Sequence, residues 1–320
     1  MADYLVTGVA GFIGRSIAAE LLKRGERVRG IDNFSTGKRE NVAGLEQMEL
    51  MEADIKDASA CQAACRGMDI VFHQAALASV PRSVLDPVTT NENNVSGTLQ
   101  LLLAARDAKV RRFVFAGSSS VYGDSPTLPK HEGMPPNPIS PYAVSKLAGE
   151  LYLKAFYSVY GLEGVVLRYF NVFGPYQDPS SMYSGVLAKF SLNMLRGEAP
   201  TVFGDGEQSR DFTYIENVVR GNLLAAHAPA AAVAGTVMNV ATGSRITLND
   251  TVKLLRELTG YSGEVKHGPE RAGDIKHSLA DITLAGKRLG YAPQVDFREG
   301  LRRTVEWYKT IMADEDTTAR

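Results

Sequence analysis

The first half of the chain alternates between short apolar runs and longer segments in which apolar residues recur every three or four positions. The short runs predict buried β-strands, and the amphipathic segments predict α-helices. The predicted strands cover residues 4–7, 27–31, 48–51, 70–72, 112–116 and 164–167, and the predicted helices cover residues 12–23, 95–108 and 141–160. This alternation favours an α/β fold with a doubly wound parallel sheet and right-handed crossovers.

The regular alternation ends near Asn171, after which short strand-like runs, Pro/Gly turns and helical segments are mixed. Residues 236–240 are strand-like again and are expected to return to the sheet. We therefore expect a domain of residues 1–170 with a return near 214–241, and a smaller, discontinuous α/β lobe of residues 171–213 and 242–320. The Ala-rich residues 228–234 are interpreted as a loop, and the polar residues after Ala313 are expected to fray.

Composition and charge narrow the classes of function. A chain of 320 residues with 44% hydrophobic residues can bury a sizeable core. Its formal net charge of −1 gives no overall attraction to nucleic acid or acidic lipid, so neither is an expected partner. No apolar run approaches the roughly 20 residues that a membrane span needs. The start of the chain lacks the basic region of a signal peptide, so the cytoplasm is the expected compartment.

The two cysteines, Cys61 and Cys65, are four residues apart in a segment expected to be helical. Two cysteines exclude a disulfide framework. Because no further ligand types accompany the pair, we interpret both as packing residues and expect no metal site.

A glycine motif follows the first predicted strand. Gly8, Gly11 and Gly14 stand where strand turns into helix, and glycines there permit a tight turn and close approach of a pyrophosphate. The helix then offers free N–H groups and the positive end of its dipole. Alone, the motif would also suit an ordinary glycine-rich turn. Asp32 at the end of the second strand strengthens the interpretation, since a carboxylate there binds ribose hydroxyls and repels a 2′-phosphate. The motif and Asp32 together predict an NAD site.

Two further charged residues lie near this predicted site. Arg39 is interpreted as a solvated surface charge rather than a partner for a 2′-phosphate. Asp54 and Ile55 follow the third strand and could meet the adenine, although Asp54 by itself would suit a strand-end cap.

The stretch from Ser140 to Lys146 carries the candidate chemistry. Ser140 is a good helix N-cap and Pro141 a good first helical residue, so Tyr142 and Lys146 share one face at the helix start. A nearby ammonium and the helix dipole both favour a phenolate, so we expect a lowered pKa for Tyr142. By itself, a Tyr and Lys four residues apart also suits an incidental pair on an amphipathic helix. Hydroxyls at Ser118 and Ser119, where the fifth strand ends, could bind a reacting oxygen.

These motifs resemble the extended branch of the short-chain dehydrogenase/reductase family, in which the doubly wound sheet is a Rossmann domain. The resemblance rests on the Gly-x-x-Gly-x-x-Gly spacing, on residues 32–37 and 73–76, and on the Tyr142 and Lys146 pair. It implies that Ser118, Tyr142 and Lys146 are catalytic, with Ser119 as a close helper and Ser120 less certain. It also implies cofactor contacts from Phe12, Ile13, Asn33, Ser35, Thr36, Gly37, Gln74, Ala75, Ala76, Asn93, Tyr169 and Val172.

Within that branch the chain resembles UDP-sugar 4-epimerases, closest to the subgroup acting on UDP-N-acetylglucosamine. Residues 167–175, 204–206, 210–212 and 271–274 carry the similarity to the epimerases, and residues 79–83 and 271–279 carry the similarity to the subgroup. The implied substrate contacts are Ser79, Ser83, Asn171, Val186, Val202, Phe203, Arg210, Arg271, Asp274 and Ser278, together with Ser118, Ser119 and Tyr142. Arginines suit the diphosphate because a guanidinium offers paired donors.

The resemblance implies reversible epimerisation at C4 through a transient 4-keto sugar, with NAD tightly bound. Ser278 is small, where a tyrosine in the family restricts the enzyme to UDP-glucose and UDP-galactose. We therefore expect turnover of UDP-N-acetylglucosamine and UDP-N-acetylgalactosamine, with the non-acetylated pair accepted more weakly.

Two alternatives stay open. A nucleotide-sugar 4,6-dehydratase shares the oxidation step, but its family places an Asp-Glu pair where this chain has Ser119 and Ser120. A protein that binds NAD without chemistry could lose the catalytic residues, which this chain keeps. The helices at 95–108 and 141–160 carry extra apolar residues, so a homodimer through a four-helix contact is also expected, unless these residues line the core: Leu99, Leu102, Leu103, Leu151, Leu153 and Phe156.

Overall fold

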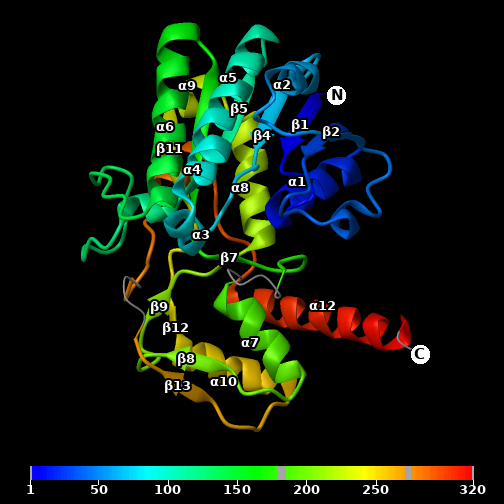
Figure 1. The fold of residues 1–320 in the computed structure, drawn as a ribbon. Coiled ribbons are helices and arrows are strands. Elements are labelled where there is room, and N and C mark those ends of the chain that lie inside the picture. The colour runs from blue at the N-terminus through cyan, green and yellow to red at the C-terminus, as the bar shows by residue number, and fades with distance from the viewer. Residues whose placement is uncertain (1, 179–184, 271–274, 319–320) are drawn as a thin grey trace.

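The computed structural model describes residues 2–178, 185–270 and 275–318, with the side chains described up to residue 313. Its centre is a parallel seven-stranded sheet in the order β11-β6-β5-β4-β1-β2-β3 (Figure 1). The strands are β1 (Asp3–Thr7), β2 (Arg27–Asp32), β3 (Glu49–Glu52), β4 (Ile70–His73), β5 (Arg112–Ser118), β6 (Glu163–Tyr169) and β11 (Thr236–Val240). The strand order reverses between β1 and β4, so a doubly wound sheet forms a crevice there. The predicted fold class is confirmed.

Helices cover both faces of the sheet. One face packs against α1 (Phe12–Lys23) and α8 (Ile215–His227), and the other against α2 (Ala58–Cys65), α5 (Gly97–Asp107) and α6 (Pro141–Tyr160). Cys61 and Cys65 are buried in the second of these cores, and burial raises the pKa of both thiols to about 12. They are packing residues, as predicted. Shorter segments are η1 (Arg39–Val42), α3 (Val80–Leu85), α4 (Pro87–Asn91), the π-helical turn η2 (Glu92–Ser96), η3 (Ser119–Tyr122) and α9 (Ala230–Val233).

The long helix α6 begins and ends where its residue types predict. The Ser140 hydroxyl accepts a hydrogen bond from the Ala143 N–H at 3.2 Å, which satisfies one of the free donors of the first turn. Pro141 occupies the first turn, where its missing N–H costs nothing. Gly161 ends the helix with a φ of 74°, a left-handed conformation that favours glycine. The start of α6, which carries Tyr142, is thus fixed by local sequence.

A second group of elements lies beyond the carboxyl ends of the strands (Figure 1). Its helices are α7 (Val186–Leu195), α10 (Leu248–Thr259) and α12 (Phe297–Thr318), whereas α11 (Thr283–Leu289) packs against β11 of the central sheet and against α8 and α9. Three two-stranded sheets pair β7 (Val172–Phe173) with β10 (Thr213–Tyr214), β8 (Thr201–Phe203) with β13 (Lys266–Gly268), and β9 (Ser209–Arg210) with β12 (Ile246–Thr247). The division into a cofactor domain and a substrate lobe stays a prediction.

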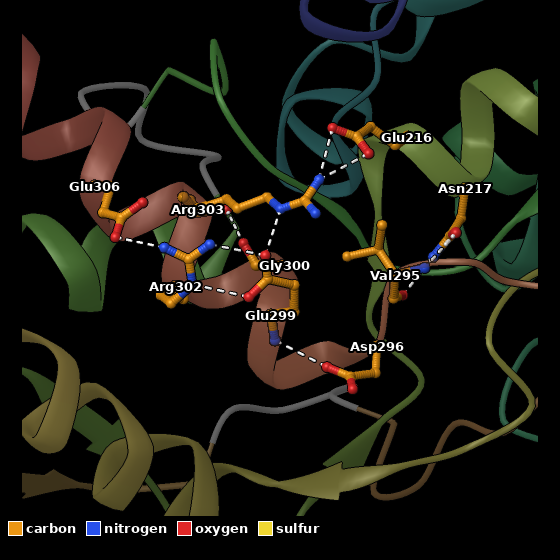
Figure 2. A network of polar contacts seen from close by, with 10 residues as sticks. Glu216, Asn217, Val295, Asp296, Glu299, Gly300, Arg302, Arg303 and Glu306 are labelled. Carbon is orange, nitrogen blue, oxygen red and sulfur yellow. Dashed lines mark hydrogen bonds and ion pairs between the residues drawn. The ribbon is translucent and has the colours of Figure 1, made fainter.

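Polar contacts join α12 to the start of α8 (Figure 2). The Asn217 side chain donates to the Val295 carbonyl at 2.7 Å and accepts from the Val295 N–H at 3.1 Å. Arg303 pairs with Glu216 at 3.0 Å and also with Glu299, one turn earlier on its own helix. Because Asn217 is fully buried, its bonds to backbone carry more weight than the exposed ion pairs. They tie the second group of elements to the sheet.

Two local expectations were wrong. Residues 230–233, expected in a loop, form the short helix α9, in keeping with the high helix propensity of alanine. Residues after 313, expected to fray, continue α12 to Thr318. No helix in the described ranges is both long and apolar enough to cross a membrane. Residence in the cytoplasm stays a prediction.

Candidate functional site

A first cavity of about 90 Å³ lies at the carboxyl ends of β1, β2 and β4, at the reversal of strand order. This is where open α/β sheets bind ligands. The predicted cofactor residues that line it are Gly8, Gly11, Asp32, Asn33, Ser35, Thr36, Gly37, Ile55, Gln74, Ala75, Ala76 and Asn93. Ile31, Ala53 and Leu77 also line it and were missed, because an apolar residue at a strand end carries no motif of its own.

The glycine turn is packed too tightly for larger residues. Gly8 has a φ of 67°, and a Cβ there would lie 2.7 Å from the Ala75 nitrogen. A Cβ on Gly14 would lie 2.2 Å from the Gly8 carbonyl oxygen. Gly11 is the N-cap of α1 and provides no side-chain cap, so the first N–H groups of the helix stay available for an anion. Phe12 and Ile13 lie in this first turn of α1.

Asp32 is buried at the rim of the same cavity. Its two carboxylate oxygens accept the N–H groups of Ala10 at 2.9 Å and Phe34 at 2.8 Å. Burial raises the pKa of Asp32, and these two hydrogen bonds oppose the rise. Arg39 pairs with Glu52 at 2.6 Å at the surface, so its charge is already matched. A buried carboxylate beside an anion-binding helix start fits NAD, with no cation committed to a 2′-phosphate.

Three predicted cofactor residues lie beside this cavity rather than in its wall. Asp54 accepts a hydrogen bond from the Asn33 amide at 3.0 Å. The Tyr169 hydroxyl donates to Asn222 at 2.9 Å and lies within 3.3 Å of the Gln74 amide oxygen. Val172 lines the second cavity, described below.

The candidate catalytic residues meet where β5 ends and α6 begins. The Ser118 side chain lies close enough to Tyr142 to interact with its hydroxyl, and this interaction lowers the Tyr142 pKa. The Ser118 hydroxyl also accepts from the Ser120 hydroxyl at 2.8 Å. Ser120, ranked behind Ser119 by the resemblance, is therefore the serine that contacts Ser118, while Ser119 begins η3.

The expected lowering of the Tyr142 pKa is wrong for the chain by itself. Burial raises that pKa above its usual value, and the interaction with Ser118 only partly opposes the shift. The ammonium of Lys146 lies 6.0 Å from the Tyr142 ring centroid and donates to the Ala116 carbonyl at 3.0 Å. Burial lowers the pKa of Lys146 to about 8, opposed by Glu150. The residue spacing correctly places both groups on one face, but it does not reveal how strongly burial disfavours each charge.

A second cavity, of about 240 Å³, lies among the elements beyond the sheet. The predicted substrate residues that line it are Asn171, Val186, Phe203 and Arg210. Sequence reasoning missed the other lining residues, of which only Phe173 and Phe212 lie in segments with a motif: Phe173, Gln177, Gly185, Leu187, Phe190, Thr201, Gln208, Phe212 and Leu248. Asn171 has a φ of 32°, an unusual conformation for a residue other than glycine and a frequent feature of functional sites.

Other predicted substrate residues lie outside this wall. Val202 is 1% exposed in the core, and Ser83 is fully buried with its hydroxyl donating to the Val80 carbonyl at 2.7 Å. Ser79 caps α3 by accepting from the Arg82 N–H at 3.1 Å. The Ser278 N–H donates to the Ser209 carbonyl at 3.0 Å, which places Ser278 alongside the strand that carries Arg210. The predicted contacts Arg271 and Asp274 lie outside the described residues.

Among the described residues, no cluster of three or more His, Cys, Asp or Glu side chains is arranged to hold a metal ion.

A dinucleotide crevice with Ser118, Tyr142 and Lys146 at its edge defines an enzyme of the short-chain dehydrogenase/reductase class. The comparison with family models agrees, because the model described as "NAD dependent epimerase/dehydratase family" matches residues 4–241. The chain belongs to this family.

Relatives extend the match over nearly the whole chain. A "UDP-glucose 4-epimerase" of Mycolicibacterium smegmatis is 40% identical over 95% of this chain and 98% of its own. The structure of a UDP-N-acetylglucosamine 4-epimerase from Methanobrevibacter ruminantium, in complex with UDP-N-acetylmuramic acid, is 42% identical with a TM-score of 0.92, covering 97% and 99% of the two chains. A UDP-glucose 4-epimerase from Thermus thermophilus in complex with NAD is 39% identical with a TM-score of 0.88, covering 96% and 99%.

These comparisons confirm the resemblance to the epimerase branch and NAD as the cofactor. The preferred sugar is not decided by them, because the relatives carry names for different UDP-sugars.

Proposed function

We propose that the chain catalyses reversible epimerisation at C4 of UDP-N-acetylglucosamine and UDP-N-acetylgalactosamine, with weaker turnover of UDP-glucose and UDP-galactose. The observation that carries the 4-epimerase assignment is the hydroxyl pair of Ser118 and Tyr142 at the carboxyl edge of the sheet, with Lys146 on the same helix face. The similarity to UDP-sugar 4-epimerases over nearly the whole chain supports it.

Each catalytic side chain has one task. Tyr142 takes the proton of the C4 hydroxyl and returns it at the end of the cycle. Ser118, which interacts with Tyr142, holds the reacting oxygen. Lys146, charged below a pKa of about 8, stabilises the phenolate form of Tyr142. NAD, when bound, supplies the hydride acceptor and donor, and the 4-keto sugar turns over between the two transfers.

The second cavity suits the nucleotide part of the substrate. The Arg210 guanidinium offers paired donors to a diphosphate, and Asn171 offers an amide. The aromatic rings of Phe203 and Phe212 provide apolar surface for a base. Arg271 and Asp274 are part of this proposal on the resemblance alone. Beside the first cavity, Asp32 would hold the ribose hydroxyls of NAD.

Two observations weigh against the alternatives. A 4,6-dehydratase must also remove a C5 proton and expel the C6 hydroxyl, and Ser119 and Ser120 offer no carboxylate for either step. An NAD-binding protein without chemistry does not need Ser118 and Tyr142 placed close enough to interact.

The direct test is an equilibrium assay that presents UDP-glucose and UDP-N-acetylglucosamine side by side. Formation of the C4 epimer of the acetylated sugar at the higher rate is the expected result. Release of water with a 4-keto-6-deoxy product would instead establish the dehydratase, and absence of turnover with every UDP-sugar would leave only NAD binding.

The preference for the acetylated sugar rests on the small size of Ser278. Ser278→Tyr should abolish the acetylated activity and retain the other, because a phenol ring and an acetamido group cannot share one space. Ser278→Ala is the matched control, since it keeps the residue small, and it should leave the ratio of activities unchanged. An equal ratio in the tyrosine variant would overturn the role of Ser278 and leave the epimerase proposal intact.

We also propose that two copies of the chain pair through α3, α4 and α6. The four-helix contact expected from residues 95–108 and 141–160 is thereby changed, because Leu102, Leu153 and Phe156 line the core, the alternative left open for them. Exposed apolar side chains gather on α3, α4 and α6, which pack against one another: Val84 at 62%, Leu85 at 77%, Val88 at 66%, Val144 at 52% and Leu151 at 59%. A second copy would cover this surface by the same residues on both sides. Leu85→Asp should shift the protein from dimer to monomer in sedimentation velocity, and a monomeric wild type would overturn the proposal.

A further inference from the structure

His73 is the last residue of β4 and is 1% exposed, and the next residue, Gln74, lines the first cavity. Its Nδ1 lies 2.7 Å from the Thr7 hydroxyl, at the start of the glycine turn. Its Nε2 lies 2.8 Å from the Thr98 hydroxyl, on α5. The imidazole of His73 therefore links strand β1 to helix α5.

The surrounding bonds and the burial of the ring together point to one protonation state. The Thr98 hydroxyl donates its single proton to the Asn94 carbonyl at 2.7 Å, so it must accept a proton from Nε2. The Thr7 oxygen accepts the Ala75 N–H at 3.1 Å and uses its own proton for Nδ1. His73 is neutral and carries its proton on Nε2. Burial, together with the charge of Lys146, lowers the pKa of His73 to about 3, which agrees with this state.

The same chain of bonds continues toward Tyr142. The Asn94 amide oxygen accepts the Leu77 N–H at 2.8 Å, and its nitrogen donates to the Ser145 hydroxyl at 3.0 Å. The Ser145 hydroxyl in turn donates to the Tyr142 carbonyl at 2.8 Å. Asn94 lies in the π-helical turn η2, a distortion that often marks a functional position.

The hydrogen bonds that begin at His73 reach residues of the first cavity and residues at the start of α6. Gln74, Ala75, Ala76 and Leu77 line the cavity and follow His73 directly. The bond from Ala75 to Thr7 holds this segment against Gly8, where the backbones are in close contact. At the other end, Ser145 is on the first turns of α6, one residue before Lys146.

We propose that His73 is a positioning residue that, as a neutral ring with its proton on Nε2, holds the Gln74–Leu77 segment and the start of α6 in fixed relation across the cofactor cavity. Its effect on turnover rests on the proposed epimerase function, whereas its protonation state and its effect on NAD binding do not.

The protonation state is measured by ¹⁵N NMR of protein labelled only at histidine. The chain has five histidines, and comparison with the spectrum of His73→Phe assigns the ring in question. Nε2 should be protonated and Nδ1 bare at every pH between about 5.5 and 9, where an ordinary histidine titrates. Thr98→Val keeps the side-chain shape but removes the acceptor, so it should shift the proton toward Nδ1. A wild-type ring that titrates in this range, or carries its proton on Nδ1, would overturn the proposal.

The positioning role is measured with two variants. Thr98→Val should weaken NAD binding to cofactor-free protein about ten-fold, as expected for one buried hydrogen bond to a ring that is left unsatisfied. Ser145→Ala interrupts the link to Tyr142 alone, and should lower kcat about ten-fold with KM changed by less than about two-fold. Ser191→Ala is the matched control, because Ser191 is fully buried and its hydroxyl has no hydrogen-bond partner among the described residues.

Unchanged NAD affinity in Thr98→Val, or unchanged kcat in Ser145→Ala, would overturn the positioning role. If wild-type protein turns over no UDP-sugar, the proposed function fails, and NMR and NAD binding still decide the role of His73.

Discussion

The two cavities differ in what forms their walls. The cofactor cavity is bounded by backbone and small residues: Gly8, Gly11, Gly37, Ala75 and Ala76. The second cavity is bounded by large side chains from separate segments: Gln177, Phe190, Phe203, Arg210 and Phe212. A wall of backbone is set by turns and glycines over a few residues, whereas a wall of side chains depends on how distant elements pack.

This difference separates a cavity of fixed shape from a cavity whose shape single side chains can change. At Gly8 and Gly14 an added methyl group would strike backbone, which cannot move without disturbing the sheet. In the second cavity, replacing one side chain alters shape or charge while the fold stays in place. The first region therefore suits one fixed cofactor, and the second suits a choice among related sugar nucleotides.

The largest effect is expected at Tyr142, which belongs to neither cavity wall. Tyr142→Phe should lower kcat by at least about 100-fold, because the proton acceptor is removed while the ring remains. Affinity for NAD and for the UDP-sugar should be retained, as measured by calorimetry. Tyr157→Phe, an exposed residue on the same helix, is the control and should behave as wild type. Near-full activity of Tyr142→Phe would eliminate the mechanism.

In the first cavity, whose wall is mostly backbone, even one added methyl group should weaken NAD binding. Gly8→Ala places a Cβ 2.7 Å from the Ala75 nitrogen and should weaken NAD binding by up to about 100-fold. Gly25→Ala is the control, since Gly25 has a similar φ of 76° but no atom within 4 Å of the added Cβ. If both variants bind NAD equally, contact of the added methyl group with the wall does not limit NAD binding and the prediction is wrong.

In the second cavity, whose wall is made of side chains, a substitution should weaken UDP-sugar binding without changing NAD binding. Arg210→Ala should raise KM for the UDP-sugar about ten-fold or more, through loss of charge-assisted bonds to the diphosphate. NAD affinity should stay at the wild-type value. Arg298→Ala, which removes an exposed arginine paired with Glu257, serves as the control. A matching loss of NAD affinity would show that the two cavities are not independent.

The smallest expected effect is on the pH profile. Since burial lowers the pKa of Lys146 to about 8, its ammonium is present below that pH and is lost above it. Turnover should therefore decline as pH rises through about 8, while substrate binding in the second cavity stays constant. Lys146→Arg cannot lose its charge in this range, so its lower activity should show no alkaline decline. An unchanged alkaline limb in that variant would assign the titration to another group.

Particular residues show how far sequence reasoning reaches. The glycine turn, Asp32 and the start of α6 were located correctly because each depends on neighbours in sequence, on caps and on steric demands of the backbone. Of the predicted substrate contacts, Asn171, Val186, Phe203 and Arg210 reach the second cavity, while Val202 and Ser83 are buried away from it. A motif identifies a segment, but which of its side chains faces the cavity depends on the packing around it.

The sequence by itself determined the order of strands and helices along the chain, the cofactor crevice and the placement of Tyr142 and Lys146 on one helix face, since these follow from periodicity and from residue types at short spacing. Only the tertiary structure decided how burial shifts the pKa of Tyr142, which nitrogen of His73 carries the proton, and which side chains line the second cavity. Burial and hydrogen-bond partners control those properties, and both come from residues far apart in the chain: Thr7, His73 and Thr98 meet in one buried cluster.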